Sequence, residues 1–594
     1  MRFRTTGCIL LLLFAAWFCR AEEFGEISVE TVPLMLQEGG KFQYFVREFR
    51  LENRGAEPAE IWMRLRANSQ SVESCSAERS VLLPPGAVRN VKLFWPRNDQ
   101  SYFARYFYDV ALDLVINGRA VRHSIQVSGS STVYSRISLA SESLPFDQYR
   151  QFLKDNYSSR VEVSSVPVAQ WGRNARDYAG IHSVWISSED RLPPEVETAL
   201  RRWMFGGGAL VVCVPPDAAW PEGKEPENGV METRHGWGKR ILCRPIPPGG
   251  LKKLKTSDSG DDMKASGGAD LFGGNPPGSE DTPEYEITPG LIRLEILCSG
   301  DTESGMNLAS EFMDVLALEI PTIPLHWLFF VMLLFVILIG PVNYFVLKKF
   351  HREMLLLATT PAISLLFCLL VIGFITVSEG WYSRAKAYGI TLLDQENRLA
   401  ATRVMLGIYA PVPPGGGFVF PVDEKLNFYG AGEIDLSLNE GQHFRSGLLQ
   451  PRIPLFAAIE CVTPQREQLR IVREKGGISV VNGLGVKLTG LGVVDDEGRL
   501  FVTDDPVDPG ARVQLKPTSF RTGRSEMNWE ELLKQFGRSD APEKNFIREN
   551  IKNFAGGFYV ALAEEPLFYT PGFEPDQFEA NHLVFGRYSF SGEE

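Results

Sequence analysis

Residues 325–347, LHWLFFVMLLFVILIGPVNYFVL, and residues 354–377, MLLLATTPAISLLFCLLVIGFITV, are two apolar runs without a single Asp, Glu, Lys or Arg. Each run exceeds the roughly 20 residues that an α-helix needs to cross a hydrocarbon core of about 30 Å. Buried helices of soluble proteins are rarely so long and so free of charge. The two runs therefore predict two transmembrane helices joined by a tight loop over residues 348–353.

The loop between the two runs is basic. It carries Lys348, Lys349 and Arg352 against a single acid, Glu353. Short loops rich in Lys and Arg stay in the cytoplasm. We therefore expect the loop inside the cell and both large flanking regions outside, with the lipid bilayer as a partner of the hairpin.

Six residues are candidates for packing the hairpin: Gly340, Pro341, Asn343, Thr359, Thr360 and Pro361. The two prolines lie at matching depth, seven residues before and eight after the loop, and each removes a backbone donor. Carbonyls freed within a membrane need side-chain donors. We expect Asn343 to face the second helix near the two threonines. The alternative is that it merely reaches the headgroup region.

The N-terminus has the pattern of a secretory signal peptide over residues 1–21. Arg2 and Arg4 precede a short apolar run, and small residues allow a cut after Ala21. Arg20 so near the cut leaves an uncleaved anchor as an alternative. Cys19 allows a lipoprotein signal as a further alternative, but the residues before it are bulky where such a signal has small ones. A signal peptide predicts the same outer side for residues 22–322 as the basic loop does.

Composition bounds the function. The chain has 594 residues and a net charge of -12, which argues against nucleic acid as a partner because binding it favours an excess of Lys and Arg. Other envelope proteins are the expected partners. The seven His form no metal-binding spacing, no nucleotide-binding motif is present, and we expect no cofactor and no metal.

Two regions precede the hairpin. Residues 24–130 show short alternating runs broken by turns, such as the Asn117-Gly118 hairpin signal, and predict an immunoglobulin-like β-sandwich, with a generic β-meander as the alternative. Residues 131–249 alternate strands with helices and predict a parallel α/β sheet. One helix should begin at Pro193-Pro194 and end before the three glycines at 206–208.

A resemblance accompanies these motifs. Residues 177–186, 192–203 and 206–212, with the glycine turn at 235–240, resemble the class I glutamine amidotransferase-like fold. The Gly-Pro-Val-Asn-Tyr run at 340–344 resembles one in uncharacterised bacterial envelope proteins. In those proteins a sandwich, an amidotransferase-like domain, two transmembrane helices and a C-terminal β domain follow one another. The resemblance implies this architecture and the bacterial inner membrane, but no activity.

Cys213 is the one weak candidate for a catalytic nucleophile. An active amidotransferase places its Cys on a tight elbow between a strand and a helix. Cys213 instead lies between valines and precedes Pro215-Pro216, as a buried strand residue would. Cys213 and Cys243 fall in successive predicted strands, so a disulfide and two free thiols are both open.

The rest of the chain divides into three parts. Residues 250–290 have the composition of a flexible linker, and residues 291–322 form a juxtamembrane segment. Residues 378–594 predict a β-rich extracytoplasmic domain, with one short helix over 528–536. Its acidic cluster at 495–497 allows calcium, but the ligand spacing of a calcium loop is missing, and a hairpin turn fits it better.

The sequence thus predicts a multidomain α/β plus all-β protein with a helical hairpin. We expect a non-enzymatic scaffold or binding component of the cell envelope. Two alternatives remain: a Cys-dependent hydrolase or amidotransferase, and the membrane subunit of an export or transport complex. The spans lack the buried charges expected of a transporter.

Overall fold

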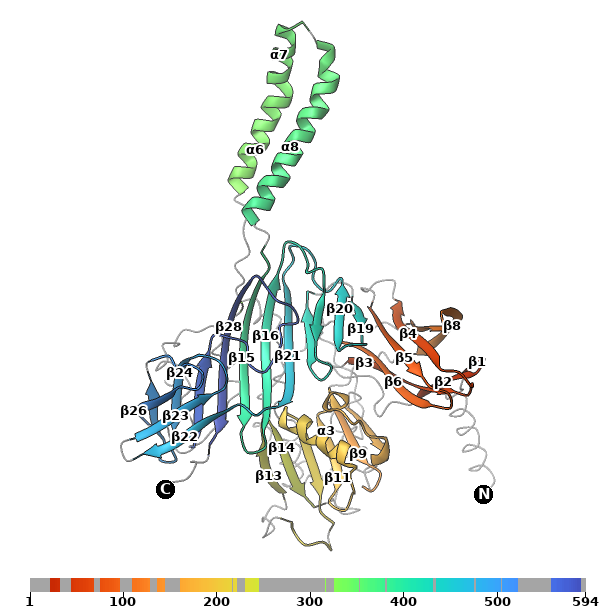
Figure 1. The fold of residues 1–594 in the computed structure, drawn as a ribbon, viewed down its shortest axis with the longest axis vertical. Coiled ribbons are helices and arrows are strands. Elements are labelled where there is room, and N and C mark those ends of the chain that lie inside the picture. The colour runs from red at the N-terminus through yellow and green to blue at the C-terminus, as the bar shows by residue number, and fades with distance from the viewer. Residues whose placement is uncertain are drawn as a thin grey trace, which may run out of the picture. The chain divides into compact units, whose positions relative to one another are not determined.

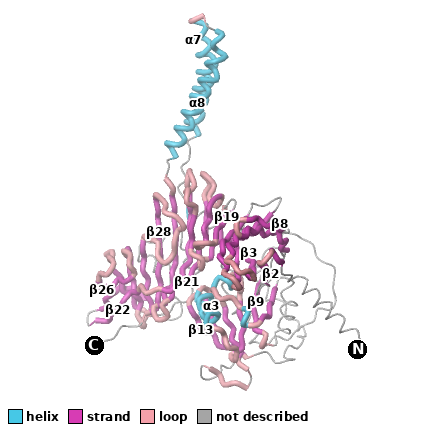
Figure 2. Tube along the Cα trace, turned by 45° about the vertical axis from the view of Figure 1, so that its right-hand side comes forward, coloured by secondary structure: helices cyan, strands magenta, loops and turns pink. Residues whose placement is uncertain are grey.

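The computed structural model describes residues 22–32, 44–68, 75–96, 109–128, 136–144, 161–215, 217–221, 230–244, 316, 325–351, 353–379, 382–430, 434–474, 477–503, 505–521 and 557–588. Several predicted features lie outside these ranges: the signal peptide, the linker, the helices at 146–157 and 528–536, Arg352 and nearly all of the juxtamembrane segment. Strands dominate (Figures 1 and 2). The chain forms two units, residues 35–43 with 132–306 and the remainder.

The N-terminal strands belong to two sheets. One sheet has the order β1-β2-β3-β6, from strands β1 (Glu22–Phe24), β2 (Ile27–Val32), β3 (Tyr44–Asn53) and β6 (Val88–Pro96). The other contains β5 (Cys75–Leu83), β4 (Ala59–Asn68), β7 (Asp109–Ile116) and β8 (Arg119–Ser128) in that order. The predicted hairpin turn is confirmed, because Asn117 and Gly118 both have positive φ angles.

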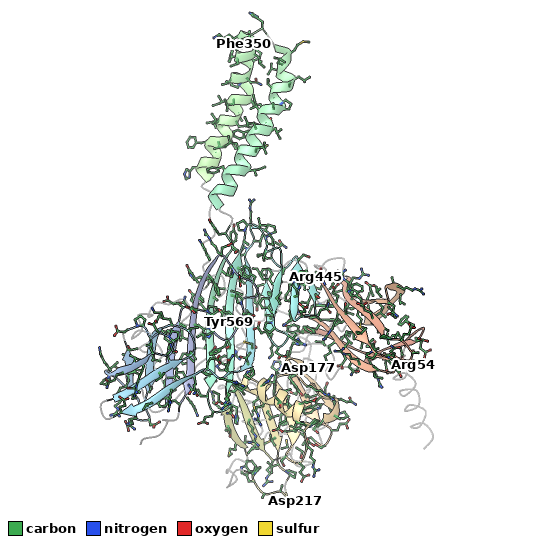
Figure 3. The ribbon with its side chains drawn as sticks, viewed as in Figure 1. Arg54, Asp177, Asp217, Phe350, Arg445 and Tyr569 are labelled. Atoms are coloured by element: carbon green, nitrogen blue, oxygen red, sulfur yellow. The ribbon has the colours of Figure 1, made fainter. Side chains whose placement is uncertain are left out.

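The second sheet does not end with the N-terminal region. Strand β19 (Ile434–Ser437) pairs in parallel with β5, and β20 (Gln442–Ser446) and β17 (Phe418–Phe420) extend the sheet further. Arg445 of β20 also forms an ion pair with Glu78 of β5 (Figure 3). Side chains of both regions, Phe49 and Phe444 among them, share one hydrophobic core. The local sequence pattern predicted two separate β regions and not this joint sheet.

The C-terminal region contains one sheet of eleven strands, in the order β18-β21-β16-β15-β28-β27-β24-β25-β26-β23-β22. The strands are β15 (Arg384–Asp394), β16 (Leu399–Tyr409), β18 (Lys425–Tyr429), β21 (Leu455–Pro464), β22 (Gln468–Glu474), β23 (Gly477–Gly483), β24 (Leu488–Val494), β25 (Arg499–Thr503), β26 (Arg512–Arg521), β27 (Phe558–Ala563) and β28 (Gln577–Arg587). β15 pairs in parallel with β28, so the first strand after the hairpin lies beside the last described strand.

The other unit is the predicted α/β sheet. Its strands are β9 (Arg136–Ser141), β10 (Val161–Val166), β11 (Ser183–Ser187), β12 (Ala209–Cys213), β13 (Val230–His235) and β14 (Gly238–Cys243). The order is β10-β9-β11-β12-β14-β13, parallel except for β13 at the edge. Helix α3 (Pro194–Phe205) begins and ends as predicted, and two short 3₁₀ turns, η2 (Val168–Gln170) and η3 (Ala175–Tyr178), precede β11.

Glycines fix the end of α3 against the sheet. A Cβ on Gly208 would meet the Trp203 ring at 2.3 Å, and one on Gly238 would meet the Met204 carbonyl oxygen at 2.0 Å. Gly236 has a φ of +66° in the β13–β14 turn. These glycines therefore serve close packing and a tight turn.

Candidate functional site: a hairpin of two apolar helices

The two predicted runs form helices long and apolar enough to cross a membrane. The first comprises α6 (Leu325–Ile337), a π-helical turn η4 (Leu338–Val342) and α7 (Asn343–Lys349). The second is α8 (Leu356–Glu379), which follows the 3₁₀ turn η5 (Glu353–Leu355). Their apolar stretches, Phe329–Lys349 and Leu356–Phe374, have mean hydropathies of 2.5 and 2.3 and are almost entirely unburied. The two helices lie side by side (Figures 1 and 2).

Asn343 forms the polar contact between the helices. Its side chain is only 7% exposed. The Thr359 hydroxyl donates to Asn343 Oδ1 at 3.1 Å, and Asn343 Nδ2 donates to the Thr360 hydroxyl at 3.5 Å. The orientation expected from the sequence is therefore present, and both the oxygen and the nitrogen of the amide have a partner in the second helix.

The other three packing candidates do not take part in this contact. Gly340, Pro341 and Pro361 are exposed. A Cβ on Gly340 would meet no atom within 4 Å, so this glycine does not permit a close approach of the helices. Pro341 lies within the π-helical turn, which is a known way of accommodating a residue that cannot complete the α-helical ladder. Pro341 therefore affects the local geometry of its own helix and not the contact between the two helices.

An aromatic pair, which the sequence did not single out, packs the hairpin closer to its open end. The rings of Phe335 and Phe367 have centroids 4.6 Å apart. Aromatic residues are frequent in apolar runs, so only the relative rotation of the two helices identifies which of them meet.

The turn between the helices keeps its positive charges at the surface. Lys348 and Lys349 are exposed, and the Lys348 ammonium lies 5.6 Å from the Tyr344 ring centroid. Phe350 marks this turn in Figure 3. His351 has a φ of 54°, which lets the chain reverse within a few residues.

Cys213 lies in the core of the α/β unit. It is 5% exposed on β12, and its Sγ is 3.7 Å from Sγ of Cys243, its register partner on the parallel strand β14. Neither thiol forms a disulfide. Cys213 is therefore a strand residue among packed side chains and not a nucleophile on an exposed elbow.

A cluster of buried polar side chains in the C-terminal sheet was missed from the sequence. The hydroxyls of Thr391 and Thr402 are 2.7 Å apart, and Thr391 Oγ1 is 2.7 Å from Nε2 of His582. Tyr569 stacks on the His582 ring at a centroid distance of 5.7 Å. These residues are far apart in the chain, and only the pairing of β15 with β16 and β28 brings them together.

Burial favours the neutral forms of His582, Cys461 and Glu424 in this region. It lowers the pKa of His582 to about 3 and raises the pKa of the Cys461 thiol. It also raises the pKa of Glu424 to about 8, against a smaller opposing effect of a backbone hydrogen bond from Thr570. A neutral thiol and a non-basic imidazole do not make a nucleophile and base at neutral pH. The cluster is therefore a polar part of the core.

The acidic turn at 495–497 is a hairpin turn between β24 and β25. Asp495 is 2% exposed, and its Oδ1 accepts hydrogen bonds from the backbone amides of Glu497 and Arg499. Its Oδ2 accepts one from Arg499 Nε at 2.7 Å. Burial raises the pKa of Asp495, but the hydrogen bonds and the charge of Arg499 outweigh this effect, so the net shift of its pKa is downward. Within the described ranges no group of three or more His, Cys, Asp or Glu side chains could hold a metal ion.

Comparison with known proteins identifies no family. No family model and no curated protein matches the chain. Among solved structures, the alkylpurine DNA glycosylase AlkC of Pseudomonas fluorescens aligns at 13% identity, 18% of this chain, 31% of that chain and a TM-score of 0.14. A putative beta-galactosidase from Bacteroides fragilis aligns at 13% identity, 33% and 38% of the two chains and a TM-score of 0.15. The chain spans well under half of each of these proteins, and similarities this low carry no argument about fold or function.

Proposed function

We propose that this chain is a non-enzymatic protein of the bacterial cell envelope. The two apolar helices span the inner membrane as a hairpin, and the strand-rich regions lie on the outer side, where they act as a scaffold or binding component for other envelope proteins. The observation that carries the proposal is the pair of long apolar helices whose apolar side chains stay exposed, while the buried polar residue Asn343 is hydrogen-bonded by the partner helix.

The charge of the turn supports the orientation. Lys348 and Lys349 remain exposed at the closed end of the hairpin, where a short basic segment favours the cytoplasm. The proposal includes a signal peptide over residues 1–21, which would deliver residues 22–322 to the outer side before the first span enters the membrane.

The proposal treats the two regions before the hairpin as binding modules. The N-terminal sandwich would be immunoglobulin-like, and the α/β unit would be a catalytically silent relative of the class I glutamine amidotransferase-like fold. The burial of Cys213 beside Cys243 supports silence, because no thiol is presented to a substrate there.

Thiol labelling of intact cells tests the orientation. Lys349→Cys lies in the basic turn and Glu440→Cys in the exposed turn between β19 and β20. We expect a membrane-impermeant maleimide to label Glu440→Cys in spheroplasts, and Lys349→Cys only after permeabilisation. Both variants are made in a chain whose own cysteines are replaced by Ser, because Cys75 is partly exposed and Cys368 is exposed. That chain without either new Cys is the control. Labelling of both variants from outside would refute the proposed topology.

A further inference from the structure

One end of the eleven-stranded sheet is tied closely to the hairpin. Helix α8 ends at Glu379 and β15 begins at Arg384. Five backbone steps cover at most about 18 Å. If α8 crosses the bilayer, as the proposed function holds, the connection uses several of these ångströms to cross the headgroup region on that side of the hydrocarbon core. The Arg384 end of the sheet must therefore stay near the membrane surface.

Strand pairing defines which other segments share that end. Arg384 is the register partner of Tyr409 on β16 and of Gln577 on β28, and Ile408 pairs with Leu455 on β21. The loops that leave these strands are joined by hydrogen bonds. The amide of Arg452 donates to the Ala410 carbonyl at 3.0 Å, and that of Gln577 donates to the Ser383 carbonyl at 3.0 Å.

This end carries exposed apolar side chains. Tyr382 and Val412 are each 59% exposed, and Ile453 is 45% exposed. We call these three residues the apolar rim. They come from three different loops, so only the fold gathers them.

The opposite end of the same strands is polar. The β15–β16 turn there consists of Asp394, Gln395, Glu396, Asn397 and Arg398. Next to it, the turn after β21 contains Gln465, Arg466 and Glu467. The end tied to α8 therefore combines the three apolar side chains with the exposed charged residues Arg452, Glu574 and Asp576, whereas the turns at the far end are polar throughout.

We propose that the apolar rim rests on the lipid headgroup region of the bilayer that the hairpin crosses. Apolar and aromatic side chains such as Tyr are suited to that layer, where one side is apolar and the other is wet. The rim and the short tether together would hold the eleven-stranded sheet upright at the membrane, with its polar end pointing away. This inference rests on the proposed function and adds a second membrane contact to it.

Depth measurements on the full chain in lipid nanodiscs test the contact. An environment-sensitive fluorophore is attached to Val412→Cys, Ile453→Cys, and two controls, Asn397→Cys at the polar end and Leu366→Cys in α8. Each is made in a chain whose own cysteines are replaced by Ser, because Cys368 is exposed and Cys75 is partly exposed. Nitroxides are carried by the lipid headgroups or by the acyl chains. We expect headgroup nitroxides to quench the probes at 412 and 453 at least twofold more than the probe at 397, with blue-shifted emission at both rim positions.

The outcomes distinguish the contact of the apolar rim with lipid from the membrane insertion of the hairpin. Acyl-chain quenching at 366 without headgroup quenching at 412 and 453 overturns the rim and leaves the membrane hairpin intact. No quenching at 366 overturns both. Rim probes that are shielded from aqueous iodide yet untouched by the lipid nitroxides indicate that a second copy covers the rim, which also overturns the lipid contact.

Discussion

Two buried titratable residues set the pH dependence that we expect at the residue scale. The pKa of Glu424 is raised from 4.5 to about 8, mainly by burial. The pKa of His582 is lowered from 6.5 to about 3, also by burial. Both groups are neutral in the folded protein at pH 7, whereas Glu424 is ionised in the unfolded chain. Folding is therefore coupled to proton binding at Glu424 and to proton release at His582.

We predict a stability plateau between about pH 4.5 and 6.5. The folded state binds one extra proton at Glu424 between pH 4.5 and 8, so its stability falls as pH rises there. The folded state binds one fewer at His582 between pH 3 and 6.5, so stability rises with pH there, and the two slopes cancel where they overlap. Above pH 6.5 only Glu424 acts, and about 2 kcal/mol should be lost by pH 8.

Denaturant unfolding of the detergent-solubilised chain, followed by Trp fluorescence from pH 5 to 8, checks this prediction. Glu424→Gln should flatten the alkaline slope, because the amide has no proton to lose. The exposed Glu440→Gln should keep it. An alkaline slope that survives in Glu424→Gln would mean that other groups cause it.

At the scale of elements, the hairpin offers a test through its polar contact. Asn343→Leu removes the hydrogen bonds to Thr359 and Thr360. Interhelical hydrogen bonds within membranes contribute about 0.6 kcal/mol on average. We therefore predict a modest loss of association between the two helices and normal insertion. Val342→Leu, at an exposed neighbouring position, is the matched control.

Disulfide trapping across the helices measures the effect. Phe335→Cys and Phe367→Cys replace the ring pair, and the extent of oxidation reports how often the helices meet there. Asn343→Leu should reduce trapping by roughly threefold or less, following the average energy above. Complete loss of trapping, or failure to insert, would show that Asn343 does more than form an average contact.

At the scale of the whole molecule, Tyr44 joins segments about 380 residues apart. Its hydroxyl accepts from the Leu426 amide at 2.7 Å and donates toward Gln442 Oε1 at 3.1 Å, with the Glu424 carbonyl at 3.3 Å. The site is buried between β3 of the N-terminal β region and the turn that leads into β18. Through this contact and the β5–β19 pairing, the two β regions fold as one body.

Tyr44→Phe should destabilise both β regions together. The change leaves the Leu426 amide buried without an acceptor, which costs about 1–3 kcal/mol. We expect protease resistance of the N-terminal and C-terminal β regions to fall at the same denaturant concentration, as followed by fragment mass spectrometry. Tyr382→Phe, at an exposed tyrosine, serves as the control. Loss of only the N-terminal region would contradict a shared core.

The sequence alone determined the features that depend on neighbouring residues. Charge-free length predicted both helices of the hairpin, and Pro193-Pro194 with the glycines at 206–208 predicted the bounds of α3, because caps and hydrophobic length act within a few residues. Matching depth from the loop was enough to place Asn343 opposite Thr359 and Thr360, since a helix rises by a constant amount per residue.

Only the tertiary structure decided what joins distant segments. The parallel pairing of β5 with β19, the Thr391–Thr402–His582 cluster and the apolar rim each combine residues from separate strands or loops. Local patterning shows which side chains a strand buries, but it does not say against which strand, because many strands offer equivalent edges. The packing of the whole core decides which strands pair, and the sequence of one strand does not identify the strand beside it.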